Sequence, residues 1–254
     1  RDGGGFGVQG ELPVNQELLD WIAVEFMNKN WSMKELCRLI VTSSAYRQSS
    51  KIEEADQETD PFNRYLARGP RMRLDADTIR DQALAVAGLL SRKMYGAPVM
   101  PPQPEGVWQV VYSGEPWETS KGEDKHRRGI YTFWRRSSPY PSMVAFDAPS
   151  REICTSRRIR TNTPLQALVT LNDPVYIEAA QALARKTVAH GGDDLTSKAT
   201  YLFRRVLIRP LEASELEKLV GLFESELEHY RADTEAAKAM ATDPLGPVEE
   251  NEDL

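Results

Sequence analysis

The chain has 254 residues, of which 41% are hydrophobic and 28% are charged, and its formal net charge is −6. This length allows one large domain or two small ones with a substantial buried core. The negative charge argues against a protein that wraps nucleic acid, and no apolar run approaches the ~20 residues of a transmembrane helix. The opening RDGGGFG, without a starting Met, leads us to expect a piece of a longer protein, so the sequence gives no direct indication of localisation.

Two amphipathic helices are predicted near the start of the chain. Residues 15–29 place apolar side chains at helical spacing, namely Leu18, Leu19, Ile22 and Phe26. Ser32 and Glu35 have the spacing of a capping box, in which each side chain accepts a hydrogen bond from a backbone N–H of the helix start. A second helix is therefore expected from this point towards Tyr46.

The next segment is predicted to be an exposed connection followed by a long helix. Residues 51–60 are polar and acidic, and Asp60-Pro61 favours a short turn or helix. Asp75 is expected to cap a helix that runs through Leu90. Its core-facing residues would be Ile79, Leu84, Val86, Ala87 and Leu90.

Residues 96–142 differ from the rest because they are rich in proline, glycine and aromatic residues. Proline interrupts helices, and residues 107–112 and 130–134 have the composition of β-strands. We expect a small hairpin or an irregular insertion with short strands, lying on a helical body.

Helical signals return at Thr163-Pro164, where Gln166 completes a capping box and proline occupies the first helical position. Asp173-Pro174 predicts a further helix that ends near His190 at Gly191-Gly192. Two more helices are expected over 197–207 and 212–230. The sequence therefore predicts a mainly α, compact single domain over residues 1–241, followed by an acidic tail or linker over residues 242–254.

Familiar motifs are weak or absent. Residues 5–10 match GxGxxG, but Pro13 follows where a helix should open and no strand precedes, so we interpret them as a turn. The three histidines have no metal-ligand spacing, and no metal site is predicted. Cys37 and Cys154 are too few for a disulfide framework. We expect two separate buried thiols, with a single bridge as the alternative.

The clearest anomaly is a cluster of positive charge. Residues 125–160 contain nine basic residues and only two acidic ones, Asp147 and Glu152, which gives this segment +7 and the remainder of the chain −13. The basic residues are Lys125, Arg127, Arg128, Arg135, Arg136, Arg151, Arg157, Arg158 and Arg160. The arginines either form internal salt bridges to acidic helices or present a surface for carboxylate, sulfate or phosphate. Nucleic acid is disfavoured because the charge elsewhere would repel it.

Four blocks of the chain resemble one protein family. They cover residues 7–50 (beginning GVQGELPVNQELLDW), 60–90 (DPFNRYLARGPRMRL), 127–184 (with YTFWRRSSPYPSMVAFDAPSREICTSRRIRTNTPLQAL) and 202–219 (LFRRVLIRPLEASELEKL). These blocks resemble the C-terminal domain of unknown function of large planctomycete proteins, which commonly carry a cytochrome c-like domain upstream. The most distinctive blocks, 133–136, 146–149 and 157–171, overlap the arginine-rich segment.

This resemblance implies an exported protein, periplasmic or at the cell surface. It implies linkage to a haem on a separate upstream domain, with no cofactor in this chain itself. Some relatives carry carbohydrate-binding modules, which suggests contact with polysaccharide. The resemblance supplies no catalytic residues.

Three functions follow as expectations. The first is a non-catalytic binding or docking module for an anionic glycan or an adjacent domain of the same polypeptide, using Trp134, Arg135, Arg136, Arg157, Arg158 and Arg160. The second is a carbohydrate-active or redox-coupled enzyme, for which Asp147 is the one catalytic candidate, since helix capping already explains Asp173. The third is a structural domain that completes the fold of its upstream neighbour.

Overall fold

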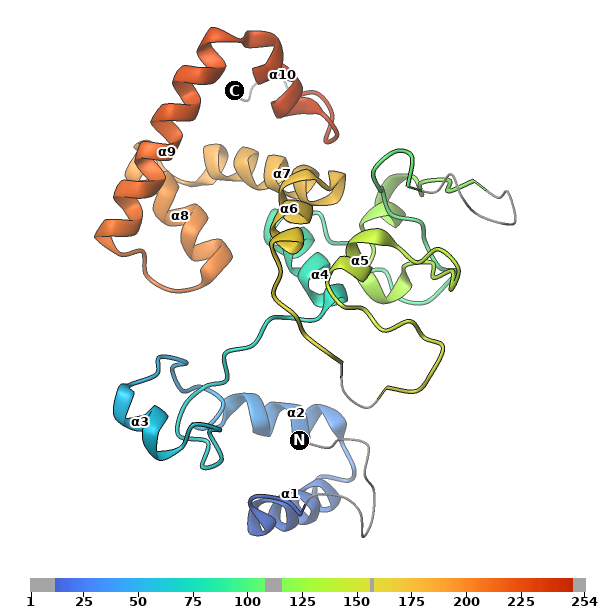
Figure 1. The fold of residues 1–254 in the computed structure, drawn as a ribbon, viewed down its shortest axis with the longest axis vertical. Helices are drawn as coiled ribbons and strands as arrows, with labels where there is room; N and C mark the ends of the chain where they lie inside the picture. Colours follow the sequence, from blue (N-terminus) through green and yellow to red (C-terminus); the bar gives the residue numbers. More distant parts are fainter. Residues whose placement is uncertain (1–11, 108–115, 156–157, 249–254) are drawn as a thin grey trace. The chain divides into compact units, whose positions relative to one another are not determined.

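The computed structural model describes residues 12–107, 116–155 and 158–248. They form ten α-helices and two short 3-10 helices (Figure 1). The mainly helical fold that the sequence predicts is therefore confirmed. The chain divides into two compact units, an N-terminal unit of residues Arg1–Arg73 with Thr155–Arg157, and a C-terminal unit of Leu74–Cys154 and Arg158–Leu254. The expected single domain over 1–241 stays a prediction.

The N-terminal unit contains α1 (Gln16–Asn28), α2 (Met33–Thr42) and the short α3 (Glu54–Thr59). The first two helices are confirmed, and both begin at side-chain caps. Asn15 accepts a hydrogen bond from the backbone N–H of Leu18 at 2.9 Å, and Ser32 accepts one from that of Glu35 at 3.4 Å. Neither α1 nor α2 contains a buried residue, so their apolar side chains remain open on the surface.

The connection after α2 differs from its prediction in one respect. Within residues 51–60, expected to be an exposed connection, Glu54–Thr59 form α3. A tight turn follows, in which the Asp60 carboxylate accepts from the N–H of Tyr65 at 2.9 Å. Arg68 donates to the carbonyl oxygen of Asp60 at 2.6 Å. The Asp60-Pro61 signal therefore marks a turn that an arginine stabilises from within.

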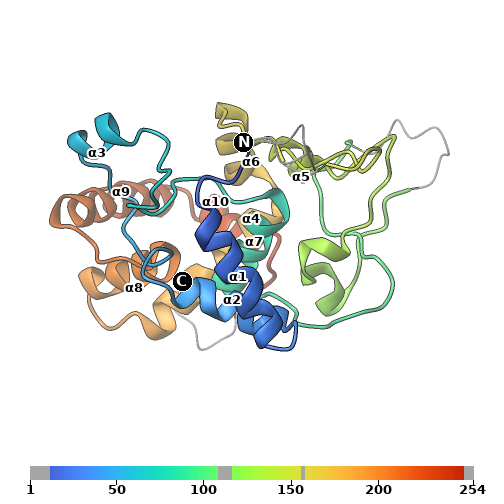
Figure 2. The ribbon, with the colours of Figure 1, turned by 90° about the horizontal axis from the view of Figure 1, so that it is seen from below.

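The C-terminal unit is built on α4 (Ala76–Ala87) packed against α7 (Pro174–His190). The remaining elements are η1 (Gly122–His126), η2 (Gly129–Tyr131), α5 (Pro141–Ala145), α6 (Pro164–Asn172), α8 (Leu195–Leu207), α9 (Ala213–Ala232) and α10 (Thr234–Thr242). Within this unit, α8 and α9 lie side by side on one side of α4 and α7, and α5 with its loops lies on the other side (Figure 1 and Figure 2). The helices predicted from Thr163-Pro164 and Asp173-Pro174 start as expected.

Two hydrophobic clusters form the core of this unit. The larger one joins buried residues of α4, α5 and α7 with the neighbouring chain, namely Ala76, Tyr140, Met143, Phe146 and Tyr176. Trp117 and Trp134 pack against it. The smaller cluster contains Ala87, Ala179 and Ala182, where small side chains let α4 and α7 approach closely. The Pro-rich segment thus contributes directly to the core through Trp117 and Tyr140.

Helix α4 shows two corrections to the sequence prediction. It ends at Ala87 rather than Leu90, because Gly88 takes a left-handed conformation with φ +79° and donates to the carbonyl oxygens of the last turn. Asp75 stands at the N-cap position without a side-chain cap hydrogen bond. Its carboxylate pairs with Arg160 and Arg158 instead.

The Pro-rich segment forms no strand within its described residues. The strand predicted over residues 130–134 is wrong, because η2 occupies Gly129–Tyr131 and only an isolated bridge joins Thr132 to Val99. Val99 nevertheless exchanges backbone hydrogen bonds with residues on either side of Thr132. The other predicted strand, 107–112, lies almost wholly outside the described residues, and Val107 is in a turn.

The structure also tests the predictions for the C-terminal tail and for the two cysteines. The first residues of the expected tail, up to residue 248, lie against α7, where Leu245 joins the smaller core cluster. Cys37 and Cys154 are free and exposed, so the expected burial of both thiols is wrong. Among the described residues, no helix is both long and apolar enough to cross a membrane.

Candidate anion-binding surface

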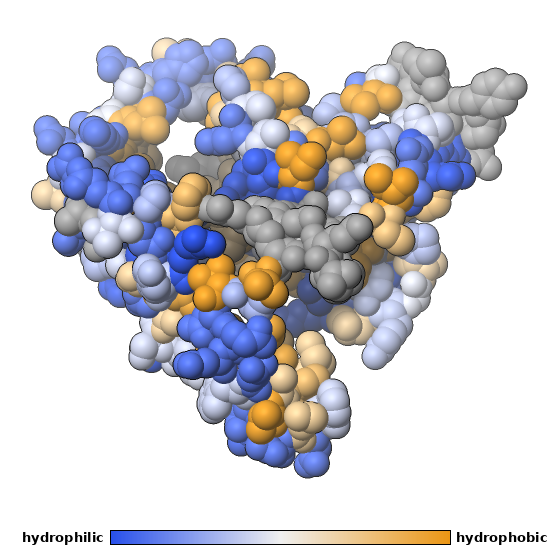
Figure 3. All heavy atoms as spheres, turned by 60° about the horizontal axis from the view of Figure 1, so that its bottom comes forward, coloured by the Kyte–Doolittle hydropathy of each residue, from blue (hydrophilic) through white to orange (hydrophobic). Residues whose placement is uncertain are grey.

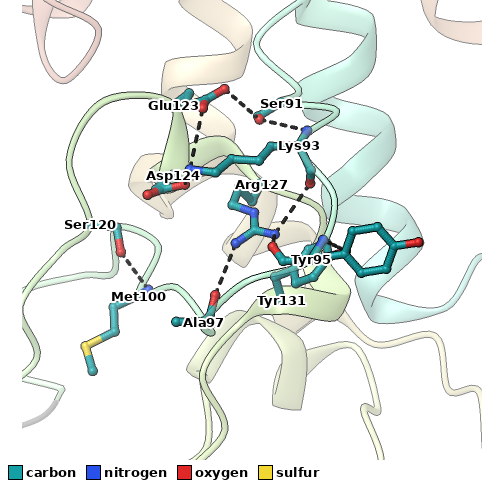
Figure 4. Close-up of polar contacts among 10 residues, drawn as sticks. All are labelled: Ser91, Lys93, Tyr95, Ala97, Met100, Ser120, Glu123, Asp124, Arg127 and Tyr131. Carbon is teal, nitrogen blue, oxygen red and sulfur yellow. Dashed lines mark hydrogen bonds and ion pairs between the residues drawn. The ribbon is translucent and has the colours of Figure 1, made fainter.

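The structure places Arg127 in the interior, where it acts as an anchor for the chain between α4 and η1. Its side chain is 2% exposed and donates to the carbonyl oxygen of Ala97 at 3.1 Å and to that of Tyr95. The guanidinium carbon lies 3.8 Å from the centroid of the Tyr131 ring. Figure 4 shows these contacts converging on one arginine. Arg127 is therefore a buried structural residue.

The acidic residues around η1 also have internal partners. The ammonium of Lys93 lies 2.9 Å from Asp124 and 3.6 Å from Glu123 (Figure 4), and Glu123 accepts a hydrogen bond from the Ser91 hydroxyl at 3.1 Å. These pairs hold η1 to the end of α4. No group of three or more potential metal ligands gathers among the described residues.

Lys125 and His126 meet a buried carboxylate on α7. Glu178 is 1% exposed, and its two oxygens lie 2.5 Å from Lys125 Nζ and 3.0 Å from His126 Nε2. Burial alone would raise the pKa of Glu178, but the hydrogen bonds from His126 and Lys125 outweigh it and lower the pKa below its ordinary value. This group joins η1 to α7.

Three of the basic residues reach the acidic side of α4. Arg158 lies 3.1 Å from Asp77 and 3.9 Å from Asp75, and Arg160 lies 2.9 Å from Asp75. Arg128 lies 3.5 Å from Asp81. At least one side chain of each pair is about one-third exposed or more, so each pair contributes little stability by itself. The salt-bridge interpretation of the basic segment therefore holds for Arg128, Arg158 and Arg160.

Asp147, the one catalytic candidate, holds a turn together. It has a left-handed backbone, with φ +60°, and its carboxylate accepts from the backbone N–H of Thr161 at 2.8 Å and from the Thr161 hydroxyl at 2.9 Å. Gln166 donates to the same carboxylate at 3.5 Å. These bonds tie the end of α5 to the start of α6.

The structure brings Trp134 together with Arg151, a residue outside the predicted site. The indole N–H donates to the carbonyl oxygen of Ser150 at 3.1 Å, and the guanidinium carbon of Arg151 lies 4.8 Å from the indole ring centroid. Arg136 is exposed two residues further on, whereas Arg135 is half-buried and has interactions of its own within the protein. Arg157 lies outside the described residues. We call Trp134, Arg136 and Arg151 the Trp134 surface.

Sequence reasoning missed the burial of two polar residues in the core. Arg80 is 1% exposed and donates to the carbonyl oxygens of Arg127 at 2.6 Å and Lys125 at 2.8 Å. A signal was present, because Arg80 stands four residues after Ala76 and four before Leu84, on the buried stripe of α4. Asp173 caps α7 through the N–H of Val175 at 3.0 Å, and burial raises its pKa to about 6.

Comparison with known proteins identifies a family but no function. No curated protein and no solved structure matches the chain. Residues 3–223 match the family described as PSD1, protein of unknown function (DUF1553). That match spans most of both units and includes the arginine-rich segment, the α4 carboxylates and the Trp134 surface. The chain therefore belongs to the PSD1 family of proteins of unknown function (DUF1553).

Proposed function

We propose that this chain is a non-catalytic binding module that holds an anionic partner on the Trp134 surface. The observation that carries the proposal is the Arg151 guanidinium stacked 4.8 Å from the Trp134 ring centroid. A stacked guanidinium keeps its in-plane N–H donors free for a carboxylate or sulfate. Arg136, exposed two residues along the chain from Trp134, adds a second positive charge.

The chemistry of the partner follows from these groups. Carboxylates or sulfates on an acidic polysaccharide would pair with the two guanidinium groups, and a sugar ring could lie beside the indole. A carboxylate-bearing face of an upstream domain offers the same charges. The family resemblance supports either partner, because it implies an exported, periplasmic or cell-surface protein that carries a cytochrome c-like haem domain upstream of this one.

Arg158 and Arg160 have a different role in this proposal. Their ion pairs with Asp75 and Asp77 neutralise them, so they position the loop before α6 rather than bind a ligand. Arg135 is half-buried, and its replacement would perturb the fold as well as the surface. The informative replacements are therefore Arg136 and Arg151.

The experiment measures binding of the chain to heparin and to polygalacturonate at low and moderate salt. Arg136→Ala with Arg151→Ala should weaken binding about tenfold or more, because each charge-assisted contact contributes ~1.5 kcal/mol or more. The matched control is Arg47→Ala with Arg231→Ala, which removes the same charge from exposed positions elsewhere, in the turn after α2 and on α9. Equal losses of affinity in the two variants would mean that net charge alone explains the effect, and would refute the proposal.

The binding function is favoured over catalysis by the state of Asp147. Its carboxylate accepts hydrogen bonds from both donor groups of Thr161, which gives it a structural role in holding the chain before α6. The enzyme hypothesis has no other candidate from the sequence. The enzyme hypothesis would regain support if the isolated chain acted on a uronic-acid polysaccharide and lost that activity on Asp147→Asn.

A structural function is the second candidate, because the helices of the N-terminal unit leave their apolar residues open. In α1, Leu19, Trp21 and Val24 are each about half exposed, although a helix with such residues normally buries them. Figure 3 shows hydrophobic residues, in orange, open on the face that it views. Trp21→Ser with Val24→Ser should abolish association of this chain with its upstream domain and leave the melting temperature unchanged. A lower melting temperature would show that these residues pack within the chain.

A further inference from the structure

The C-terminal unit contains a hollow at the end of α4 that the proposed function does not use. Its volume is about 270 Å³. It is bounded by the end of α4, by one side of α7 and by the segment after α10, through Ala87, Gly88, Leu89, Ala182, Arg185, Lys186, Ala189, His190 and Leu245. The Trp134 surface contributes none of these residues.

The floor of this hollow is apolar and firmly packed. Ala87 is 1% exposed and Ala182 is 8% exposed, and Leu89 and Leu245 pack against them in the smaller core cluster. A floor of methyl and isobutyl groups favours an apolar ligand body, at about 0.8 kcal/mol for each CH₂ removed from water.

The wall opposite α4 is held in place by two side chains of α7, one turn apart. Gln181 donates to the carbonyl oxygens of Met240 at 2.5 Å and Asp243 at 2.7 Å, and accepts from the N–H of Leu245 at 3.1 Å. Arg185 donates to the carbonyl oxygens of Ala241 at 3.0 Å and Gly246 at 2.5 Å. The Arg185 Nε is buried and has no hydrogen-bond acceptor.

The rim of the hollow carries charge of one sign. Its titratable lining residues are Arg185, Lys186 and His190, and no acidic residue is among the lining residues that the structure describes. Lys186 lies directly over Gly88, since a Cβ built on this glycine would stand 1.8 Å from the ammonium nitrogen. Gly88 therefore makes room for Lys186 at the mouth of the hollow.

We propose that this hollow binds a small organic acid, with its apolar body on the alanine and leucine floor and its carboxylate beside Lys186. The size suits a body of about eight carbon atoms, and a ligand pocket with an apolar lining and few polar groups is the usual arrangement. The Lys186 ammonium, held at the mouth of the hollow over Gly88, selects an anion over a neutral molecule of the same shape.

The test uses octanoate as the probe and 1-octanol as its neutral counterpart, with the intact chain followed by backbone amide NMR shifts. We expect octanoate to shift Gly88, Leu89 and Ala189, and Lys186→Gln to weaken its binding about tenfold, as the loss of a charged contact predicts. The control Lys238→Gln, on the exposed side of α10, should bind as the parent does.

Three outcomes would overturn the proposal: no saturable shifts with octanoate, equal affinities for octanoate and octanol, or undiminished binding in Lys186→Gln. A second variant guards against misfolding as an explanation. Gly88→Ala would displace Lys186 from its position and strain a left-handed residue. It should also lose octanoate binding, and unchanged affinity in a folded Gly88→Ala chain would equally contradict the proposal.

Discussion

Replacement of Asp173 by Asn should raise the stability of the chain at neutral pH and change its stability little in acid. Burial raises the pKa of Asp173 to about 6, from an ordinary 3.8. A carboxyl whose folded-state pKa is raised adds stability below the unfolded pKa and loses it as the pH rises through the folded value. Above pH 7, the charged form therefore costs about 3 kcal/mol relative to the neutral form.

Asn is a suitable replacement because it keeps the acceptor that caps α7. The wild-type side chain accepts from the Val175 N–H at 3.0 Å, and Asn is as good an N-cap as Asp. At pH 7.5 the variant lacks the buried charge, so its free energy of unfolding should exceed that of the parent. At pH 4 the parent is itself protonated in the folded state, and the two chains should differ little.

The assay is urea denaturation of both chains at pH 4 and pH 7.5. The gain from Asp173→Asn should be larger at pH 7.5 than at pH 4 by about 2 kcal/mol. Comparing the two chains at each pH cancels the titration of the other groups. A gain of equal size at both values would mean that Asp173 is solvated or paired in its charged form, and would refute this reasoning.

Three further replacements test the internal partners of the basic segment by the same denaturation assay at pH 7. Arg127→Met should destabilise the chain by about 3 kcal/mol, because it removes the buried guanidinium that donates to the carbonyl oxygens of Tyr95 and Ala97; a loss under 1 kcal/mol would contradict the anchor role. Glu178→Gln should cost about 3 kcal/mol, since it breaks a buried contact with Lys125 and His126, and a neutral effect would mean that water replaces it. Asp77→Asn should cost less than about 1 kcal/mol, because both its carboxylate and its partner Arg158 are about one-third exposed; a large loss would show a stronger pair than its exposure implies.

Local signals predicted the helices well, because each start is determined by residues within one turn. Ser32 caps α2, and Thr163 with Gln166 forms the capping box of α6. The end of α4 was also a local matter, since a glycine after Ala87 can take the left-handed conformation that stops a helix. The prediction carried this helix on to Leu90 because leucines continue the apolar pattern past the glycine.

The partners of the basic residues could not be predicted from the sequence, because they lie far away along the chain. Arg158 meets Asp77 across 81 positions, and Lys125 meets Glu178 across 53. The sequence favoured salt bridges to acidic helices in general but gave no means of assigning them. The sequence analysis therefore grouped Arg158 with Trp134 in one site. In the structure, Arg158 pairs with Asp77 of α4, and Arg151 lies over the indole of Trp134.

The segment after α10 determines where this protein can be shortened. Residues 3–223 match the family, yet Gln181 and Arg185 find their acceptors between residues 240 and 247. A chain trimmed at the family boundary would leave an amide and a guanidinium without acceptors beside Ala179 and Ala182, two small residues of the core. Such a trimmed protein should aggregate, and a protease that cuts near Leu245 should loosen α7 before it affects any other helix.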